Sequence, residues 1–339
     1  MTLIANEKNV ESVITATDML EVIDLIEDAY RQKREGVATL YPRQTIQYPP
    51  DKGYYADSAI RLLAGFLPRM DSAAVRLYPL SHPDEITEDG HRILDYKMGQ
   101  EILLYYRYDN QMELAGIFSG RRIMDLRTAA PTGVATRHLS RNSSRVLGIV
   151  GAGRHAPWQI QAICAVRPIE EVKIYSPTEV NREKLAYAMR GQIQARVSAV
   201  DSARKAVDGA DIVTTVTNAN EPVIAADWLA DGTHVNVVAR GEIDDATLIR
   251  SGSVWCSWRE QILRDVPEFR PVPDVLRSGR LSENDFYDLD EAITGSITRQ
   301  RESDVTVFLS QGVGMWDAAV AAWAYRRLLA HGVGLDLEL

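Results

Sequence analysis

The stretch 146–156 constrains the fold of this chain more than any other part of its sequence. A β-branched apolar run ends there in Gly151-Ala-Gly153-Arg-His-Ala156, and a helical pattern of apolar residues follows. A strand, a glycine turn and a helix N-terminus in this order form the dinucleotide-binding fingerprint, which allows alanine at its third glycine position. Backbone N–H groups at such a turn can hold a pyrophosphate, helped by the dipole of the helix. The sequence therefore predicts a dinucleotide site with Gly151 and Gly153 at the phosphates.

Two side chains of the turn, those of Arg154 and His155, sit where they can face the predicted phosphates. Arg154 could add a charge-assisted hydrogen bond to a phosphate oxygen. For His155, a solvent-facing place in the turn is the structural alternative, and the sequence leaves both interpretations open.

Strands and helices alternate along the chain after the turn. Alternation of this kind is typical of a mostly parallel sheet with helices on both faces. The sequence therefore predicts a Rossmann-type, doubly wound α/β domain. Its expected strands are 146–150, 171–175, 196–200, 211–216, 234–238 and 253–257, and its clearest helices are 179–190 and 201–208.

The flanking parts of the chain follow another pattern, which predicts a mixed α+β domain. An amphipathic helix is expected at 17–35, and strand signals dominate from Ile60 to Leu126. A helix of small residues is expected at 128–140, and an alanine-rich helix at 315–329. Because such a last helix seldom ends a Rossmann sheet by itself, we expect it to return to the first domain.

The composition excludes several other classes of protein. Aspartate and glutamate (47) outnumber lysine and arginine (38), and no basic stripe occurs, so nucleic acid is not expected as a partner. No apolar run approaches the ~20 residues of a membrane span, and the N-terminus lacks the layout of a signal peptide. With 2 cysteines in no ligand pattern, no metal site is expected. These features favour a cytoplasmic enzyme with a small-molecule substrate.

The end of the second predicted strand selects between NAD and NADP. NAD sites usually place an acidic side chain there for the ribose 2′-hydroxyl. Here the strand ending at Tyr175 runs into Ser176-Pro-Thr178, with Arg182 one helical turn further on. Hydroxyls and a guanidinium suit a 2′-phosphate, so NADP(H) is favoured and NAD(H) is the alternative. Glu179 is the contrary feature, unless it only complements the helix dipole.

Further candidates for the cofactor site follow later strands. The strand at 211–216 ends in Thr217-Asn218, at the strand end that faces the cofactor crevice of an open α/β sheet. Structural capping is the alternative role of these two side chains. Val238 follows the next strand and Gly312 precedes the last helix, and both are predicted cofactor contacts.

Three arginines, Arg43, Arg76 and Arg127, form the other group of candidates. Arg76 interrupts an apolar strand, and Arg127 lies between the apolar run ending at Leu126 and the next helix. A cation inside an apolar strand is costly unless it is paired. Each arginine alone is usually a surface or ion-paired residue, whereas three in one domain predict a pocket for a carboxylate. Asp317, at the start of the last helix, is either a first-turn acid or a residue near the nicotinamide.

These motifs together resemble those of the ornithine cyclodeaminase/μ-crystallin family. The resemblance implies a homodimer that uses NAD(P) and acts on amino or imino acids, with Arg43 and Arg127 as its substrate-carboxylate arginines. It also implies a substrate-binding and dimerisation domain of residues 1–127 and 317–339, and a Rossmann domain of residues 128–316. The matching segments are Tyr41-Pro-Arg43, the strand around Arg76, Asp125-Leu-Arg127-Thr128-Ala-Ala130, Gly151-Ala-Gly153, Thr214-Thr-Val-Thr-Asn218, Gly241-Glu-Ile-Asp244 and the segment from Val305 to Asp317.

Two departures from the family bear on the reaction. The family usually has a lysine where Arg76 stands, and arginine stays protonated, so Arg76 can bind or polarise but cannot exchange protons. The family's cyclodeaminases carry an aspartate in the loop after the strand at 234–238. Here that loop, Val238-Ala-Arg-Gly-Glu242, is shorter and lacks it. Glu242 and Asp244 fall nearby but align better with the start of the following helix.

These features favour an NAD(P)H-dependent reductase of an imino or ketimine acid, or equivalently an amino-acid dehydrogenase. Its predicted catalytic residues are Arg76, Arg127 and Asp317, and the arginines would bind the substrate carboxylate and any second acidic group. Imine reduction requires fewer acid and base groups from the protein than cyclodeamination does, because the cofactor supplies the hydride and the protein mainly positions the reactants.

Two alternatives stay open. An ornithine cyclodeaminase with bound NAD would release ammonia without a net change in cofactor absorbance. A μ-crystallin-like binding protein with little catalysis would bind NADPH tightly without turnover.

Overall fold

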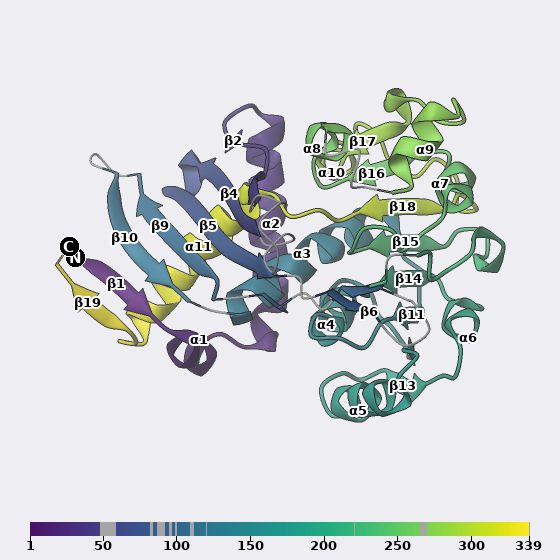
Figure 1. Ribbon diagram of the computed structural model, residues 1–339, viewed down its shortest axis with the longest axis horizontal. Coiled ribbons are helices and arrows are strands. Elements are labelled where there is room, and N and C mark those ends of the chain that lie inside the picture. The colour runs from purple at the N-terminus through teal and green to yellow at the C-terminus, as the bar shows by residue number, and fades with distance from the viewer. Residues whose placement is uncertain are drawn as a thin grey trace. The chain divides into compact units, whose positions relative to one another are not determined.

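The computed structural model divides into two compact units (Figure 1). The first unit comprises Met1–Thr15, Gln32–Arg127 and Gly312–Leu339, and the second comprises Ala16–Arg31 and Thr128–Gln311. The structure describes residues 1–47, 59–81, 84–86, 92–94, 97–98, 100–108, 112–119, 121–219, 221–264 and 270–338.

The second unit is built on a parallel sheet with the strand order β13-β12-β11-β14-β15-β18-β16-β17. Its first five places follow the 3-2-1-4-5 order of dinucleotide-binding folds, which confirms the predicted Rossmann-type sheet. The two strands that the sequence analysis did not predict, β17 and β18, are short. The bounds are β11 (Val146–Val150), β12 (Glu171–Tyr175), β13 (Arg196–Ala199), β14 (Ile212–Thr215), β15 (His234–Val237), β16 (Val254–Cys256), β17 (Phe286–Asp288) and β18 (Thr306–Leu309).

Helices and the sheet of the second unit enclose two apolar cores. One core gathers Leu147, Ile149 and Ile160, and the other Val150, Val213 and Val235, so successive residues of β11 point into different cores. The helices are α4 (Ala156–Val166), α5 (Glu179–Arg190), α6 (Ala203–Val207), α7 (Asp245–Ser251), α8 (Arg259–Arg264), α9 (Val272–Arg277) and α10 (Leu289–Ile293), with 3₁₀ turns at Ala226–Trp228 and Glu283–Asp285.

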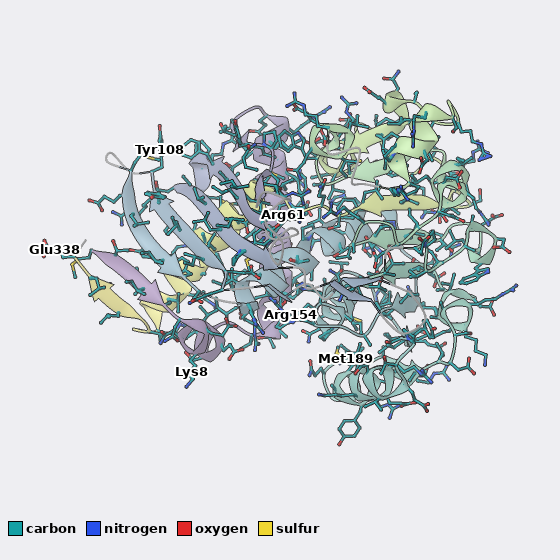
Figure 2. All side chains as sticks on the ribbon, in the orientation of Figure 1. Lys8, Arg61, Tyr108, Arg154, Met189 and Glu338 are labelled. Carbon is teal, nitrogen blue, oxygen red and sulfur yellow. The ribbon has the colours of Figure 1, made fainter. Side chains whose placement is uncertain are left out.

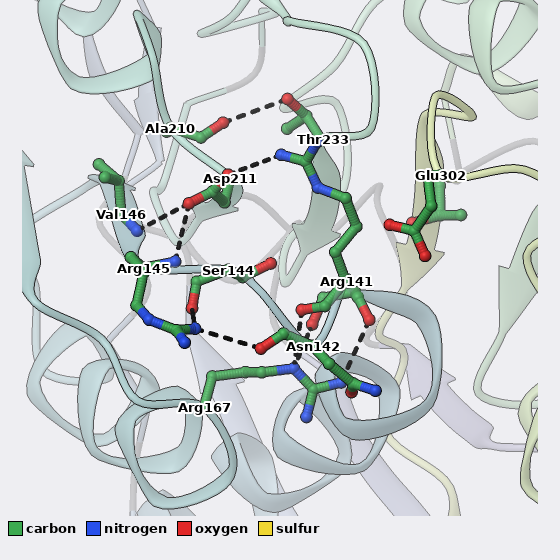
Figure 3. Close-up of polar contacts among 12 residues, drawn as sticks. Arg141, Asn142, Ser144, Arg145, Val146, Arg167, Ala210, Asp211, Thr233 and Glu302 are labelled. Carbon is green, nitrogen blue, oxygen red and sulfur yellow. Dashed lines mark hydrogen bonds and ion pairs between the residues drawn. The ribbon is translucent and has the colours of Figure 1, made fainter.

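A polar network fixes the point where the first strand of this sheet begins (Figure 3). The Asp211 carboxylate accepts hydrogen bonds from the backbone N–H groups of Arg145 (2.7 Å) and Val146 (3.0 Å) and from Arg141 Nη2 (2.6 Å). Arg167 Nε in turn donates to the carbonyl oxygen of Arg141 at 3.1 Å. The start of β11 is therefore anchored, and with it the place of the glycine turn at its other end.

The first unit is built on a mixed sheet with the main strand order β19-β1-β10-β9-β5-β4-β2, on which β3 pairs with β4 and β8 with β5. This sheet and the parallel one together confirm the predicted pairing of a mixed α+β domain with a Rossmann-type domain. The strands are β1 (Thr2–Ala5), β2 (Thr39–Leu40), β3 (Gln44–Gln47), β4 (Ala59–Leu67), β5 (Ser72–Ser81), β8 (Lys97–Met98), β9 (Ile102–Arg107), β10 (Glu113–Phe118) and β19 (Leu335–Leu337), with β6 (Asp84–Ile86) and β7 (Arg92–Leu94) paired separately.

Four helices complete the chain: α1 (Glu7–Val13), α2 (Met19–Arg34), α3 (Arg121–Leu139) and α11 (Gly314–Ala330). Short 3₁₀ turns lie at Ala16–Asp18 and Pro68–Met70. Within the part of the chain that the structure describes, no helix combines the length and the apolar character needed to cross a membrane.

Helix α11 packs against β4, β5 and β9 through an unusually close contact (Figure 1). A Cβ atom on Gly314 would lie 2.0 Å from the Ala64 carbonyl oxygen, and one on Gly65 would lie 2.4 Å from the Gly314 backbone. Ser72 Oγ also donates to the Ala318 carbonyl oxygen at 2.7 Å. These contacts hold the first turn of α11, which carries Asp317, directly against the sheet.

Helix α3 begins earlier than the sequence analysis expected. The strand signal was expected to run to Leu126, but the segment is helical from Arg121, so Arg127 lies inside a helix rather than before one. The reason lies far away in the sequence. The Glu7 carboxylate accepts hydrogen bonds from the backbone N–H groups of Arg121 (2.7 Å) and Arg122 (3.3 Å), and so caps the helix.

Most of helix α2 belongs to the second unit, whereas the sequence analysis placed this segment with residues 1–127. Glu27 of α2 accepts hydrogen bonds from Arg31 Nη2 at 2.6 Å and from Arg137 Nη1 at 2.7 Å. Burial alone would raise the pKa of Glu27, but hydrogen bonds from His138 and Arg137 lower it to about 2. These contacts tie α2 to the C-terminal half of α3.

We expect Gly65→Ala to lower the free energy of unfolding by about 1–3 kcal/mol, as overpacking typically does, because the new methyl group would collide with the Gly314 backbone. Gly191→Ala is the matched control, since a Cβ atom there meets no atom within 4 Å. Urea denaturation measures both variants. Equal stability of the two would contradict the close approach of α11 to β4.

Candidate functional site

The glycine turn of the second unit has the geometry that a dinucleotide requires. Gly151 has a φ of +120°, and a Cβ atom there would lie 2.2 Å from the Val216 carbonyl oxygen, so only glycine fits. Gly153 is exposed, and a Cβ atom there would meet nothing within 4 Å. The backbone at Gly153 is therefore open to a phosphate, as the second glycine of the fingerprint must be.

The residues that follow Gly153 lead directly into helix α4. Ala156 is fully buried, as the third small residue of the fingerprint must be to let the helix pack on the strand. Arg154 and His155 are half-buried, and Arg154 extends from the turn between β11 and α4 (Figure 2). The turn therefore presents a glycine backbone and a cation beside a helix N-terminus, which is the chemistry that a pyrophosphate needs.

Arg182 folds back to the end of β12. Its Nη1 donates to the Ser176 carbonyl oxygen at 3.1 Å, while Ser176 is buried and Thr178, the N-cap residue of α5, is exposed. Glu179 is mostly exposed, and its carboxylate lies 3.7 Å from Arg182 Nη2. The strand end thus carries a guanidinium and hydroxyl groups, and its nearest acid is engaged with that guanidinium.

A buried acid that the sequence analysis assigned to a helix start joins the loops beside the glycine turn, at the same edge of the sheet. Glu242 is fully buried and accepts hydrogen bonds from Thr215 Oγ1 (2.8 Å), from the Ala239 N–H (2.8 Å) and from the Thr217 N–H. Burial raises the pKa of Glu242 to about 7, against the lowering effect of these donors. Glu242 therefore joins the loops that follow β14 and β15.

The remaining candidates on this edge have distinct places. Asn218 is exposed beyond β14, and the Val238 N–H donates to the Thr215 carbonyl oxygen at 3.1 Å. Asp244 is the N-cap of α7, where its carboxylate accepts from the Thr247 N–H at 2.8 Å. Asp244 thus begins the helix, as the sequence suggested, while Glu242 does not.

A buried cluster of charged side chains occupies the first unit. Asp317 Oδ1 lies 3.2 Å from Arg127 Nε and 3.7 Å from Arg76 Nη1, and Arg76 Nε lies 3.3 Å from Glu101 Oε2. All four residues are less than a tenth exposed. Two of the predicted arginines, Arg76 and Arg127, therefore meet at Asp317.

The strand register explains why Arg76 points into the unit. Arg76 of β5 pairs with Leu63 of β4 and Leu103 of β9, and all three side chains are buried on the face that α11 covers. The Arg76 guanidinium also stacks 4.1 Å from the centre of the Tyr78 ring. The cost of a cation inside an apolar strand is thus offset by ion pairs and by an aromatic ring.

Two further predicted residues lie in this unit. Gly312 was predicted as a cofactor contact, and a Cβ atom there would lie 3.0 Å from Arg127 Nη1, so glycine leaves room for that guanidinium. Arg43 is half-buried just before β3.

Asp317 differs electrostatically from an ordinary first-turn acid. It is completely buried, and this burial raises its pKa to about 7 although the charge of Arg76 lowers it. Asp317 can therefore exchange a proton near neutral pH, which neither arginine can do.

Sequence reasoning missed the ion pair of Glu101 with Arg76, and it missed the hydrogen bonds with which Glu242 joins two loops. Glu101 precedes a strand like many surface acids, and only the register of β9 beside β5 brings it to Arg76. The shortened loop 238–242 was noticed, but no local pattern indicates that its glutamate turns inward.

The Rossmann order of the sheet and the open glycine turn define a dinucleotide-binding protein. The chain matches the ornithine cyclodeaminase/mu-crystallin family over residues 4–332, and it belongs to that family.

Three relatives illustrate the range of the family. A Δ1-pyrroline-2-carboxylate reductase of Bacillus cereus is 33% identical over 67% of this chain and 70% of its own. The ketimine reductase mu-crystallin of Macropus fuliginosus is 31% identical over 67% and 68%. The structure of a Δ1-pyrroline-2-carboxylate reductase of Thermococcus litoralis, in complex with NADH and L-proline, superposes with a TM-score of 0.85 at 28% identity, covering 99% of this chain and 100% of that one.

Proposed function

We propose that this protein is an NAD(P)H-dependent reductase of an imino or ketimine acid, and equivalently an amino-acid dehydrogenase in the reverse direction. The observation that carries the proposal is the meeting of Arg76 and Arg127 in a buried place of the first unit, while the second unit presents an open dinucleotide turn. The reductases among the relatives support it.

In this proposal the arginines bind the substrate carboxylate, which guanidinium groups recognise through parallel hydrogen bonds. Arg43 is a further substrate contact, and the first unit is the substrate-binding unit. A bound nicotinamide would supply the hydride that goes to the carbon of the C=N bond. The imine nitrogen can enter already protonated, so that neither arginine has to serve as its acid. The protein then acts mainly by orienting the substrate.

In the second unit we propose that Gly151, Gly153, Arg154 and His155 hold the pyrophosphate. Thr217, Asn218 and Val238 are proposed to line the nicotinamide end of the site. Gly312, predicted as a cofactor contact, is proposed instead to keep space for Arg127.

The acids of the second unit favour this reaction over cyclodeamination. Cyclodeamination needs an acid or base that assists the loss of ammonia. Glu242 already accepts hydrogen bonds from Thr215, Thr217 and Ala239, and Asp244 caps a helix. Both carboxylates are thus engaged in the fold.

We expect Arg127→Ala to lower kcat/KM for imine reduction by about 100-fold or more, because truncating one partner of a buried charge pair costs about 2–5 kcal/mol. The binding of NADPH, followed by its fluorescence, should not change. The assay follows NADPH and NADH oxidation with preformed cyclic imines, and with 2-oxo acids plus ammonia or methylamine. Arg121→Ala, at an exposed position of the same helix, is the control. Unchanged turnover in Arg127→Ala would remove this residue from the site.

We further propose NADP(H) as the preferred cofactor. The guanidinium of Arg182 at the end of β12, and the absence of an acid between Tyr175 and Thr178, support this choice. A 2′-phosphate would gain a charge-assisted contact at this place, and a carboxylate would repel it.

Arg182→Ala should therefore raise KM for NADPH about tenfold and leave KM for NADH nearly unchanged, since a hydrogen bond to a charged group contributes about 1.5–3 kcal/mol. Steady-state kinetics with each cofactor measure the two values. Lys184→Ala, an exposed cation of the same helix, is the control. Equal effects on both cofactors would indicate that Arg182 only supports the turn, and NAD(H) would then be favoured.

We also propose that the protein forms a homodimer through the sheet face opposite α11. Three successive rows of paired residues run across β4, β5 and β9 on this face. Every side chain in these rows is apolar, and each is half-buried or exposed. A continuous apolar surface of this kind is typical of an interface. The side chains are Leu62, Ala64 and Phe66 of β4, Ala73, Val75 and Leu77 of β5, and Ile102, Leu104 and Tyr106 of β9.

Leu104→Asp, in the middle row of this face, should convert the dimer to monomers, because it places a charge among apolar side chains at the interface. Sedimentation velocity measures the change, and circular dichroism checks the fold. Val180→Asp, which alters a 72% exposed apolar residue of α5, should leave the dimer intact. A wild-type monomer would contradict the proposal.

A further inference from the structure

The cluster at Asp317 is incomplete in its hydrogen bonding. In the described part of the chain, neither oxygen of Asp317 has a hydrogen-bond partner, nor does Arg127 Nε or Arg76 Nη1, although all four atoms are buried. Nearly all buried polar groups in folded proteins have a partner. The contacts of 3.2 Å and 3.7 Å are therefore ion pairs without aligned hydrogen bonds, and both guanidinium groups retain donors for a ligand.

The formal charges of the cluster already balance without a substrate. Arg76 and Arg127 supply two positive charges, and Asp317 and Glu101 supply two negative ones. A substrate carboxylate would add a third negative charge to a place that excludes water. A net charge in such a place is costly, and groups there neutralise themselves by exchanging protons.

Asp317 is the member of the cluster that can restore the balance. The charged groups that face it are Arg76 from β5 and Arg127 from α3, and Glu101 before β9 faces Arg76. Neither arginine releases its proton at neutral pH. Burial has already raised the pKa of Asp317 to about 7, and a carboxylate that occupies the guanidinium groups would remove the attraction that opposes this rise.

We propose that Asp317 is an exchangeable counter-ion, which takes up one proton from solvent when the substrate carboxylate binds to Arg76 and Arg127. The inference rests on the carboxylate site of the proposed function. Before binding, Asp317 neutralises the arginines. After binding, the substrate carboxylate takes that role, Asp317 is neutral, and its new O–H group can donate a hydrogen bond. One negative charge and one proton enter together, and no covalent bond of the substrate changes.

The experiment measures proton uptake when a carboxylate probe binds to the protein with NADPH present. The probe is pyrrole-2-carboxylate, a planar analogue of a cyclic imino acid. Calorimetric titrations in two buffers that differ in ionisation heat, phosphate and Tris at pH 8 and phosphate and imidazole at pH 6, give the number of protons taken up. We expect close to one proton per probe at pH 8 and little uptake at pH 6, where Asp317 is already protonated. The Kd should rise about tenfold per pH unit above neutrality.

Asp317→Asn mimics the neutral carboxyl group. This variant should bind the probe with no proton uptake and with a Kd that does not change between pH 6 and pH 8. Glu113→Gln is the matched control, because it removes an exposed acid outside the cluster and should keep the uptake.

The possible results separate this inference from the proposed function. Binding without uptake in the wild type overturns the inference, even if Asp317→Asn does not fold, and leaves the carboxylate site standing. Full uptake in Asp317→Asn also overturns it. If the probe does not bind, while imine reduction is measured with other substrates, the inference fails and the reductase proposal stands. If neither binding nor reduction occurs, both fail.

Discussion

The burial of Asp317 between two arginines is the interaction on which the first unit depends. It joins β5, α3 and α11, which lie far apart in the sequence, at a single carboxylate oxygen. Removing one partner of such a cluster leaves an uncompensated buried charge, which typically costs about 3–5 kcal/mol. The backbone contact between Gly65 and Gly314 brings the first turn of α11 close enough for this ion pair to form.

Two of the buried acids, Asp317 and Glu242, serve different purposes, as their hydrogen bonds show. Glu242 uses both of its oxygens to accept from backbone N–H groups, and it also accepts from Thr215. These hydrogen bonds occupy both carboxylate oxygens of Glu242 and join the loops that follow β14 and β15. Asp317 has comparable burial, but within the described residues its oxygens form ion pairs without aligned hydrogen bonds. The first arrangement is typical of a structural hub, and the second of a site that a ligand completes.

Local sequence patterns predicted the second unit well, because residues close together in the sequence determine its strands, turns and helices. The glycine turn, strand β12 at 171–175 and helix α5 at 179–190 were all readable from periodicity and turn residues. Predictions failed where a distant residue decides the outcome. Glu7 caps α3 from more than a hundred residues away, so the helix begins at Arg121 rather than after Leu126.

In the candidate site, too, local sequence predicted some features, while contacts between distant residues determined the others. The sequence singled out Arg76 because a cation in an apolar strand needs a partner, and the structure supplies Asp317 and Glu101. That need was predictable from local physics. The identity of the partners was not, because strand register and the return of α11 determine which acids reach the strand.

The charge balance of the cluster also bears on the substrate. Counted alone, three arginines suggest a strongly acidic substrate, but Glu101 and Asp317 neutralise two of them. In the proposed exchange Asp317 takes up the proton, and Glu101 stays paired with Arg76. One proton compensates one carboxylate, so a second acidic group in the same place would stay uncompensated. In the proposed function, the buried cluster therefore favours a substrate with a single carboxylate, such as an imino acid with an apolar or cyclic side chain.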